Sequence, residues 1–182
     1  MGRTFKCVVA SVSLLMWAAL SSAAPAVEPS SKAAGELVAM MKSRNLETIA
    51  LEDPEHPDHF IAAMLIPGVQ LLVVGAKSTA PDYVRSQLGQ QLYRDVYATL
   101  QSAAVLDTKV FFQDMGSDGL SDDGSVDIMY EHGTKQTNFN GDWKTQKMSK
   151  AEYQEKLRKA DADYSRMLSL LAGRLRDSPG TK

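Results

Sequence analysis

The segment from Ser149 to Leu175 places the strongest constraint on the fold. Ser149-Lys150-Ala151-Glu152 has the form of a capping box, in which the serine oxygen accepts from a backbone N–H and the glutamate reaches back. Apolar side chains then recur every three or four residues, with polar residues between them: Tyr153, Leu157, Ala160, Tyr164, Met167, Leu168, Leu171 and Leu175. This pattern predicts an amphipathic helix of about 27 residues, roughly 40 Å long.

A helix with one apolar stripe needs a surface that buries it. We expect that surface to be a β-sheet of the same chain, because such stripes usually form a core face. The helix is longer than strands of five or six residues would cover, so its end could also pack on a second copy. The sequence therefore predicts a sheet beneath the helix and leaves open a homodimer through the C-terminal helix.

Short apolar and β-branched segments between turn residues predict that sheet. Two of them flank Pro67-Gly68 and indicate a central hairpin with both faces covered. Asn140-Gly141 is a favourable hairpin turn that leads into residues 142–148 as a further strand segment. The other expected strands are residues 48–51, 59–66, 69–76, 109–114, 126–132 and 135–140.

Two more helices are expected. One covers residues 31–44, where Ser30 or Ser31 could provide the cap. A middle helix begins near Thr79 and carries an apolar side chain at every fourth position, namely Val84, Leu88, Leu92, Val96 and Leu100. The predicted class is α+β, an antiparallel sheet of about five to six strands packed by an N-terminal helix, a middle helix and a long C-terminal amphipathic helix.

The N-terminal segment has the three parts of a secretory signal peptide. Arg3 and Lys6 supply positive charge, a 14-residue apolar run extends from Cys7 to Leu20, and the small residues SSAAPA follow. The run is shorter than the roughly 20 residues that a membrane-spanning helix needs. We therefore expect residues 1–26 to be cleaved, the mature chain to lack a membrane span, and its location to be periplasmic or extracellular.

Export changes the composition of the mature chain. Loss of Arg3 and Lys6 leaves 18 basic against 22 acidic residues, a net charge near −4, and loss of Cys7 leaves no cysteine. Such a domain depends on core burial rather than on disulfides. The mild acidity also lacks the basic footprint of nucleic-acid binding. The expected layout is a signal peptide at 1–26, a flexible lead at 27–32, a single domain at 33–176 and a disordered tail at 177–182.

The loop from Asp53 to His59 combines two of the three histidines with carboxylates. Imidazole and carboxylate are common zinc ligands, and a catalytic zinc site needs three protein ligands. A third would come from elsewhere in the chain, with Glu131-His132 the expected donor. The hypothesis is a zinc site at His56, His59 and His132, and the alternative is a solvated acidic turn.

A second metal hypothesis concerns the Asp- and Gly-rich stretch from residue 114 to residue 127. Calcium prefers several oxygen ligands on a tight, glycine-turned loop. Asp114, Asp118 and the glycine after it match three positions of an EF-hand-type loop, but glycine and serine stand where further ligands belong. The candidate calcium ligands are Asp114, Asp118 and Asp122, and the alternative is an ordinary exposed turn.

Other catalytic motifs are missing from the sequence. It has no nucleophile elbow, no phosphate-binding glycine loop, no H-E-x-x-H and no C-x-x-C-H. Aromatic residues gather late in the chain, including Phe139, Trp143 and Tyr153. They could stack on a ligand ring, although such residues more often close the layer between a sheet and a helix.

The order of elements over residues 47–147, a strand pair, a helix and further antiparallel strands, resembles the flavin-binding split barrels of the pyridoxamine-phosphate-oxidase type. That resemblance implies a barrel and a bound flavin, whose phosphate would need basic and hydroxyl groups. The nearest groups are Arg85, Arg94 and Lys77-Ser78-Thr79. A likeness of fold alone does not establish function.

Two functional hypotheses follow from the sequence. The first is a non-enzymatic exported domain that binds a partner protein or a small ligand, which agrees with the absence of a catalytic motif. The second is an enzyme, either metal-dependent or flavin-binding.

Overall fold

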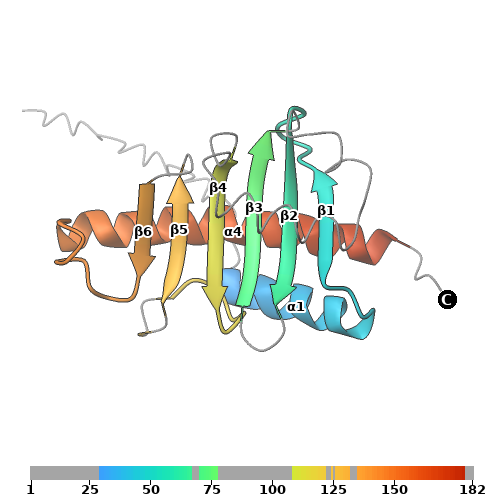
Figure 1. Ribbon diagram of the computed structural model, residues 1–182, viewed down its shortest axis with the longest axis horizontal. Helices are drawn as coiled ribbons and strands as arrows, with labels where there is room; N and C mark the ends of the chain where they lie inside the picture. Colours follow the sequence, from blue (N-terminus) through green and yellow to red (C-terminus); the bar gives the residue numbers. More distant parts are fainter. Residues whose placement is uncertain are drawn as a thin grey trace, which may run out of the picture.

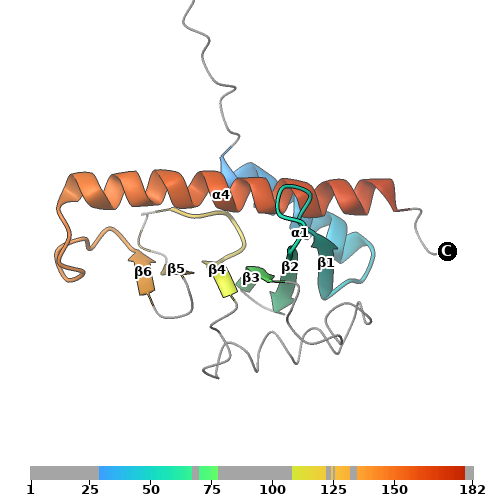
Figure 2. The ribbon, with the colours of Figure 1, turned by 90° about the horizontal axis from the view of Figure 1, so that it is seen from above.

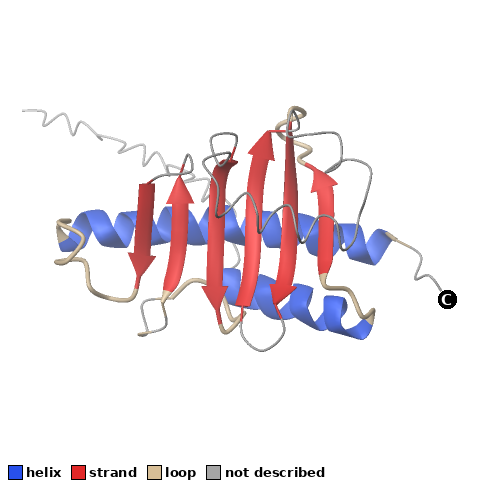
Figure 3. Ribbon diagram, viewed as in Figure 1, coloured by secondary structure: helices blue, strands red, loops and turns tan. Residues whose placement is uncertain are grey.

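The computed structural model describes residues 29–66, 70–77, 108–121, 124, 126–131 and 135–178. Six strands form one antiparallel sheet, and two helices lie on one of its faces (Figure 1, Figure 3). This confirms the α+β class and the antiparallel sheet. The elements are α1 (Ser30–Ser43), β1 (Thr48–Glu52), β2 (His59–Ile66), β3 (Gln70–Lys77), β4 (Thr108–Met115), β5 (Asp127–Glu131), β6 (Lys135–Phe139) and α4 (Lys150–Asp177).

The sheet is a simple meander. Its strands lie in chain order from β1 to β6, and every neighbouring pair is antiparallel. In this open arrangement β1 and β6 are the two edges, which differs from the barrel that the split-barrel resemblance implied. The expected turn at residues 67–68 and the expected middle helix lie outside the described residues.

Residues 142–148 form turns rather than the expected strand segment. Asp142 starts the turn, because its carboxylate and its carbonyl both accept hydrogen bonds from Thr145. The side-chain amide of Gln146 hydrogen-bonds to both backbone groups of Asn138. Its oxygen accepts from the Asn138 N–H at 2.8 Å, and its nitrogen donates to the Asn138 carbonyl at 2.7 Å. A side chain therefore occupies the outer edge of β6 where another strand would have paired, which blunts that edge against aggregation.

The helices share the inner face of the sheet. Seen from above, α4 runs the whole width of the sheet and α1 lies beside it (Figure 2). The core between them includes Phe112 and Tyr164, whose ring centroids are 4.9 Å apart, with Leu37, Leu168 and Leu171 fully buried nearby. The Phe139 and Tyr153 rings, 6.1 Å apart and buried, close the same layer at the β6 end, as the structural alternative for the aromatic group predicted.

The start of α1 differs from the expectation. The helix begins at Ser30, within the residues expected to be a flexible lead, and no side chain caps it. Ser30 is fully buried, and its hydroxyl accepts from Leu120 N–H while its own N–H donates to Asp161. The serine is therefore not free to cap the helix, because it joins α1 to the loop after β4 and to α4.

The outer face of the sheet is also apolar. Successive strand residues point to opposite faces of the sheet. The uninterrupted apolar runs at 61–64 and 71–76 therefore place apolar side chains on both faces. The side chains buried on the outer face are Ala62, Met64, Leu72, Val74, Ala76 and Phe111. In the part of the chain that the structure describes, neither helix lies on this face (Figure 2).

Among the described residues, no helix combines the length and the hydropathy that a bilayer crossing requires. The longest helix, α4, begins with the predicted capping box at Ser149 and Glu152.

This capping box gives a test of the fold. Replacement of Ser149→Ala removes the acceptor for Glu152 N–H, so we expect the free energy of unfolding to fall by about 1 kcal/mol in urea denaturation. The control is Ser169→Ala on the exposed side of α4, which should leave stability unchanged or slightly raise it. Equal stability of the Ser149 variant and the parent would show that the cap is not formed in solution.

Candidate functional site

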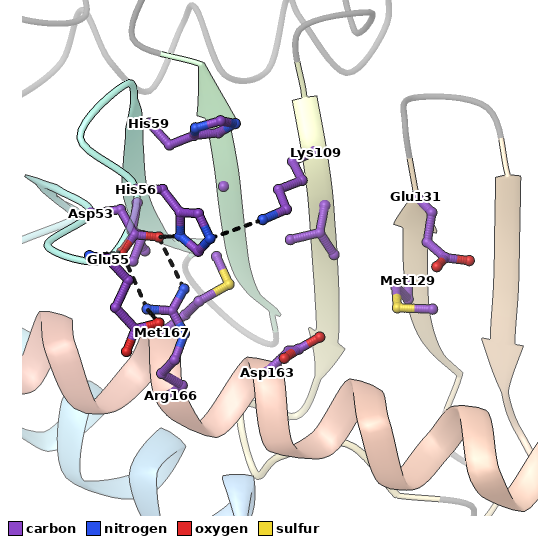
Figure 4. Close-up of a pocket in the computed structure, with 13 residues that line it drawn as sticks. Asp53, Glu55, His56, His59, Lys109, Met129, Glu131, Asp163, Arg166 and Met167 are labelled. Atoms are coloured by element: carbon purple, nitrogen blue, oxygen red, sulfur yellow. Dashed lines mark hydrogen bonds and ion pairs between the residues drawn. The ribbon is translucent and has the colours of Figure 1, made fainter.

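A cavity of about 440 Å³ lies between α4 and the inner face of the sheet, where the loop between β1 and β2 meets the ends of β3, β4 and β5. We call it the helix–sheet cavity. Figure 4 shows its lining. The lining residues are Asp53, Glu55, His56, His59, Ile61, Gly75, Lys109, Val110, Met129, Glu131, Asp163, Arg166 and Met167.

The placement of the helices explains the cavity. α1 lies under the other ends of the strands, so α4 is the only described helix near this end of the sheet (Figure 1). Gly75 adds to the space, because a Cβ atom there would lie 3.4 Å from the Met167 side chain and 3.5 Å from that of Val110. The cavity therefore combines an apolar floor with charged walls, and it carries more charged groups than most small-molecule sites do.

Asp53 is the centre of the charged wall. Its side chain is 6 % exposed, and its carboxylate accepts two hydrogen bonds from Arg166, at 3.2 Å and 3.0 Å. It also accepts from the backbone N–H of Glu55 at 3.0 Å. The Glu55 carboxylate lies 3.2 Å from the same guanidinium. The loop between β1 and β2 is thereby fastened to α4.

Asp53 is ionised. Burial alone would raise the pKa of its carboxyl, but the hydrogen bonds from Arg166, Glu55 N–H and His56, together with the charge of Arg166, hold the pKa well below its usual range. The Asp53 carboxylate can therefore only accept hydrogen bonds.

An ionised Asp53 fixes the proton on His56. The Nδ1 atom of His56 lies 3.1 Å from the Asp53 carboxylate, so it must be the nitrogen that carries the proton in the neutral ring. Nε2 then presents its lone pair, and it accepts a hydrogen bond from Lys109 Nζ at 3.4 Å. The result is a chain of contacts from Arg166 through Asp53 and His56 to Lys109 along one wall of the cavity (Figure 4).

The two histidines of the zinc hypothesis lie together. The ring centroids of His56 and His59 are 5.8 Å apart, and His59 Nδ1 lies 2.8 Å from the Asp58 carboxylate. Both rings line the same cavity, as does Glu131, whereas His132 lies outside the described residues. Over the residues that the structure describes, no group of three or more His, Cys, Asp or Glu side chains is arranged to hold a metal ion.

The cavity carries both signs of charge. Lys109, His56 and Arg166 lie on one side, and Glu131 lies on the other (Figure 4). Asp163 projects from α4 between these groups, while Glu131 is paired with Lys156 at 3.2 Å. A ligand that enters this space meets the Lys109 ammonium on one side and the Asp163 and Glu131 carboxylates on the other.

The residues of the calcium hypothesis have a different arrangement. Asp114 is fully buried, and its carboxylate accepts hydrogen bonds from Asp118 N–H, Gly119 N–H and the Tyr164 hydroxyl, at 3.1, 3.0 and 3.0 Å. The Asp118 residue itself is exposed, and Asp122 lies outside the described residues. The oxygens of Asp114 are thus used to shape the loop after β4.

Asp127 completes this loop. It is fully buried and accepts from Met115 N–H and Ser121 N–H, at 2.9 Å and 3.0 Å. Burial, reinforced by the charges of Asp114 and Asp118, outweighs these hydrogen bonds and raises the pKa of Asp127 to about 6. Burial likewise raises the pKa of Asp114.

Sequence reasoning found the loop with His56 and His59 but missed Lys109 and Arg166. Arg166 stands on α4 among many other charged residues, and nothing in the helical pattern sets it apart. Lys109 is the second residue of β4, and nothing in the strand pattern sets it apart. Only the fold brings these two side chains to the loop.

Comparison with protein-family models, with curated protein sequences and with solved structures finds no match to the chain. The geometry of the site is therefore the basis on which a function is inferred.

The Asp53 network gives a second stability test. Asp53→Asn removes the buried partner of Arg166 and leaves only the exposed Glu55 carboxylate beside this partly buried charge, so we expect the unfolding free energy at neutral pH to fall by about 2 kcal/mol. Glu155→Gln is the control, because it breaks an exposed pair with Arg158 and should leave stability unchanged. Equal effects of the two substitutions in chemical denaturation would contradict the network described here.

The raised pKa of Asp127 predicts a pH dependence of stability. Between the usual carboxyl pKa and about 6, the folded state binds a proton that the unfolded state releases. The unfolding free energy should therefore rise as the pH is lowered from about 7 to about 5, and less so in Asp127→Asn. Carbon NMR titration of the Asp127 carboxyl measures its pKa in the folded protein directly. A midpoint at the usual carboxyl value near 4 would refute the predicted pH dependence.

Proposed function

We propose that this chain is an exported, non-enzymatic domain that binds a small polar ligand in the helix–sheet cavity. The observation that carries the proposal is the buried, ionised Asp53, which holds Arg166 and His56 in fixed positions at the cavity wall. A buried ion pair is weak evidence for stability, since apolar residues of similar volume often stabilise as much. Its position beside a cavity therefore favours a role in binding.

The two walls of the cavity favour a ligand with two kinds of polar group. Lys109 would attract an anionic or acceptor group, and Asp163 and Glu131 would attract a cationic or donor group. Met129 and Met167 offer adaptable apolar contact between them. A compact organic molecule that carries both an acidic and a basic group meets these requirements best.

A ligand screen tests this proposal. Thermal unfolding is followed with millimolar amino acids, organic acids and sugar phosphates, and we expect at least one class to raise the melting temperature. Lys109→Met should weaken binding of that ligand about tenfold or more, because it removes the exposed cation of the cavity wall.

Lys159→Met is the matched control, because this lysine has its 68 % exposed side chain on α4, pairs with Glu155 and does not line the cavity. The proposal fails if no compound stabilises the chain, or if the stabilising compounds bind equally well to both variants.

Zinc binding is a second candidate, favoured by one feature. Each of the two histidines has its Nδ1 held by a carboxylate, Asp53 for His56 and Asp58 for His59. Metal-binding histidines usually have this support, which orients Nε2 toward the ion. Zinc titration followed by calorimetry would show binding that His59→Ala abolishes, and absence of binding to the full chain would reject this candidate.

The wider arrangement of the domain is also a proposal. We propose that the segment from residue 79 to residue 100 forms the middle helix and covers the apolar outer face of the sheet, which its stripe of valines and leucines suits.

A homodimer through α4 would need a polar interface, since Leu171, Ala172 and Leu175 are already buried within the protomer.

Export of the chain follows from residues 1–26, whose charged start, apolar run and small residues match a signal peptide. Mass spectrometry of the protein recovered from the envelope or the medium should find an N-terminus near residue 25 to 27. An intact Met1 on the recovered protein would contradict cleavage.

A further inference from the structure

Asp53, His56 and Lys109 have the geometry of an activated nucleophile. Such a site combines a nucleophile, a base within hydrogen-bond reach and a third group that orients the base. Here the Lys109 amine lies 3.4 Å from His56 Nε2, and His56 Nδ1 lies 3.1 Å from the Asp53 carboxylate. Arg166 fixes Asp53 from the other side, so the direction of the imidazole lone pair is set before a ligand arrives.

The surroundings suit covalent chemistry at the Lys109 amine. Lys109 is exposed and lines the cavity, so a ligand reaches its amine from solvent. In Figure 4 the amine points across the strands toward His56, above the apolar floor of the cavity. The other lysine near the cavity, Lys156, is instead held by Glu131 and by the Thr137 hydroxyl, at 3.2 Å and 3.0 Å.

We propose that the cavity takes a ligand with an aldehyde or ketone carbonyl, and that Lys109 captures it as a Schiff base with His56 as the proton carrier. This inference rests on the proposed function, because it specifies the chemistry of the ligand in the same cavity. An amine forms a Schiff base with an aldehyde or a ketone, whereas a carboxylic acid does not react with it in this way.

The step balances without an oxidant or a reductant. The Lys109 ammonium passes one proton to His56 Nε2, and its nitrogen forms a bond to the carbonyl carbon while the C=O π electrons move to oxygen. A second proton moves from nitrogen to that oxygen and gives a hydroxyl. His56 then returns its proton to the hydroxyl, the nitrogen lone pair forms the C=N bond as the C–O bond breaks, and water leaves the protonated Schiff base behind.

Asp53 acts through His56 and is a positioning residue. Its negative charge stabilises the imidazolium that exists while the proton is on His56, as an orienting carboxylate does in other proton-transfer sites. General acid–base assistance of this kind accelerates a reaction about a hundredfold or more when it is well aligned. We expect a smaller gain here, about tenfold, because the contact from Lys109 to His56 is long.

Reductive trapping tests the inference. The full chain is treated with glyoxylate, a small carbonyl acid, and cyanoborohydride at neutral pH, and each modified lysine is measured by peptide mass spectrometry over time. We expect Lys109 to be modified about ten times faster than Lys159, an exposed lysine of α4 whose neighbour is Glu155. Modification of both lysines at the same rate overturns the proposal.

Three variants separate the parts of the proposal. His56→Gln should bring the Lys109 rate down to that of Lys159, whereas Ser169→Ala, on the exposed side of α4, should leave it high. Lys109→Arg should abolish the fast phase and keep the fold, which circular dichroism verifies for every variant. A fast Lys109 that does not depend on His56 also overturns the proposal.

The ligand screen separates this inference from the proposed function. If compounds without a carbonyl bind in the cavity and Lys109 is not selectively modified, the carbonyl inference fails while ligand binding stands. If no compound binds and Lys109 is still selectively trapped, the amine is activated but the binding proposal fails.

Discussion

The ion pair between Asp53 and Arg166 is the interaction on which the site depends. These residues are 113 positions apart in the chain, and their two hydrogen bonds join the loop after β1 to the long helix α4. The pair keeps Asp53 ionised although it is buried, and an ionised Asp53 in turn sets the tautomer and direction of His56. One buried charge thereby determines the chemistry of the cavity wall.

The domain uses its buried carboxylates in two ways. Asp114 and Asp127 accept mainly from backbone N–H groups, so they shape the loop after β4 and hold it against α1 and Tyr164. Asp53 accepts mainly from side chains that reach the cavity. Burial therefore raises the pKa of the first two carboxyls, while the cation beside Asp53 lowers its pKa. The contrast separates carboxylates that shape a loop from one that lines the helix–sheet cavity.

Local patterns predicted much of this architecture, because they report periodicity and capping. The capping box at Ser149, the strands and the antiparallel sheet follow from residues that are close in sequence. The strand expected at 142–148 was wrong, since Gln146 bonds to Asn138 through its side chain, and no periodicity reports such a contact. The cavity was beyond prediction for a similar reason: Lys109 and Arg166 become neighbours of His56 only through long-range packing.

The central claim is that Asp53 keeps the proton of neutral His56 on Nδ1 and leaves Nε2 as a base that faces Lys109. Long-range proton–nitrogen NMR of the labelled imidazole, at a pH at which the ring is neutral, shows directly which ring nitrogen carries the proton. The account predicts a protonated Nδ1 and an unprotonated Nε2 for His56, and loss of that preference in Asp53→Asn. A His56 ring protonated on Nε2 would contradict it.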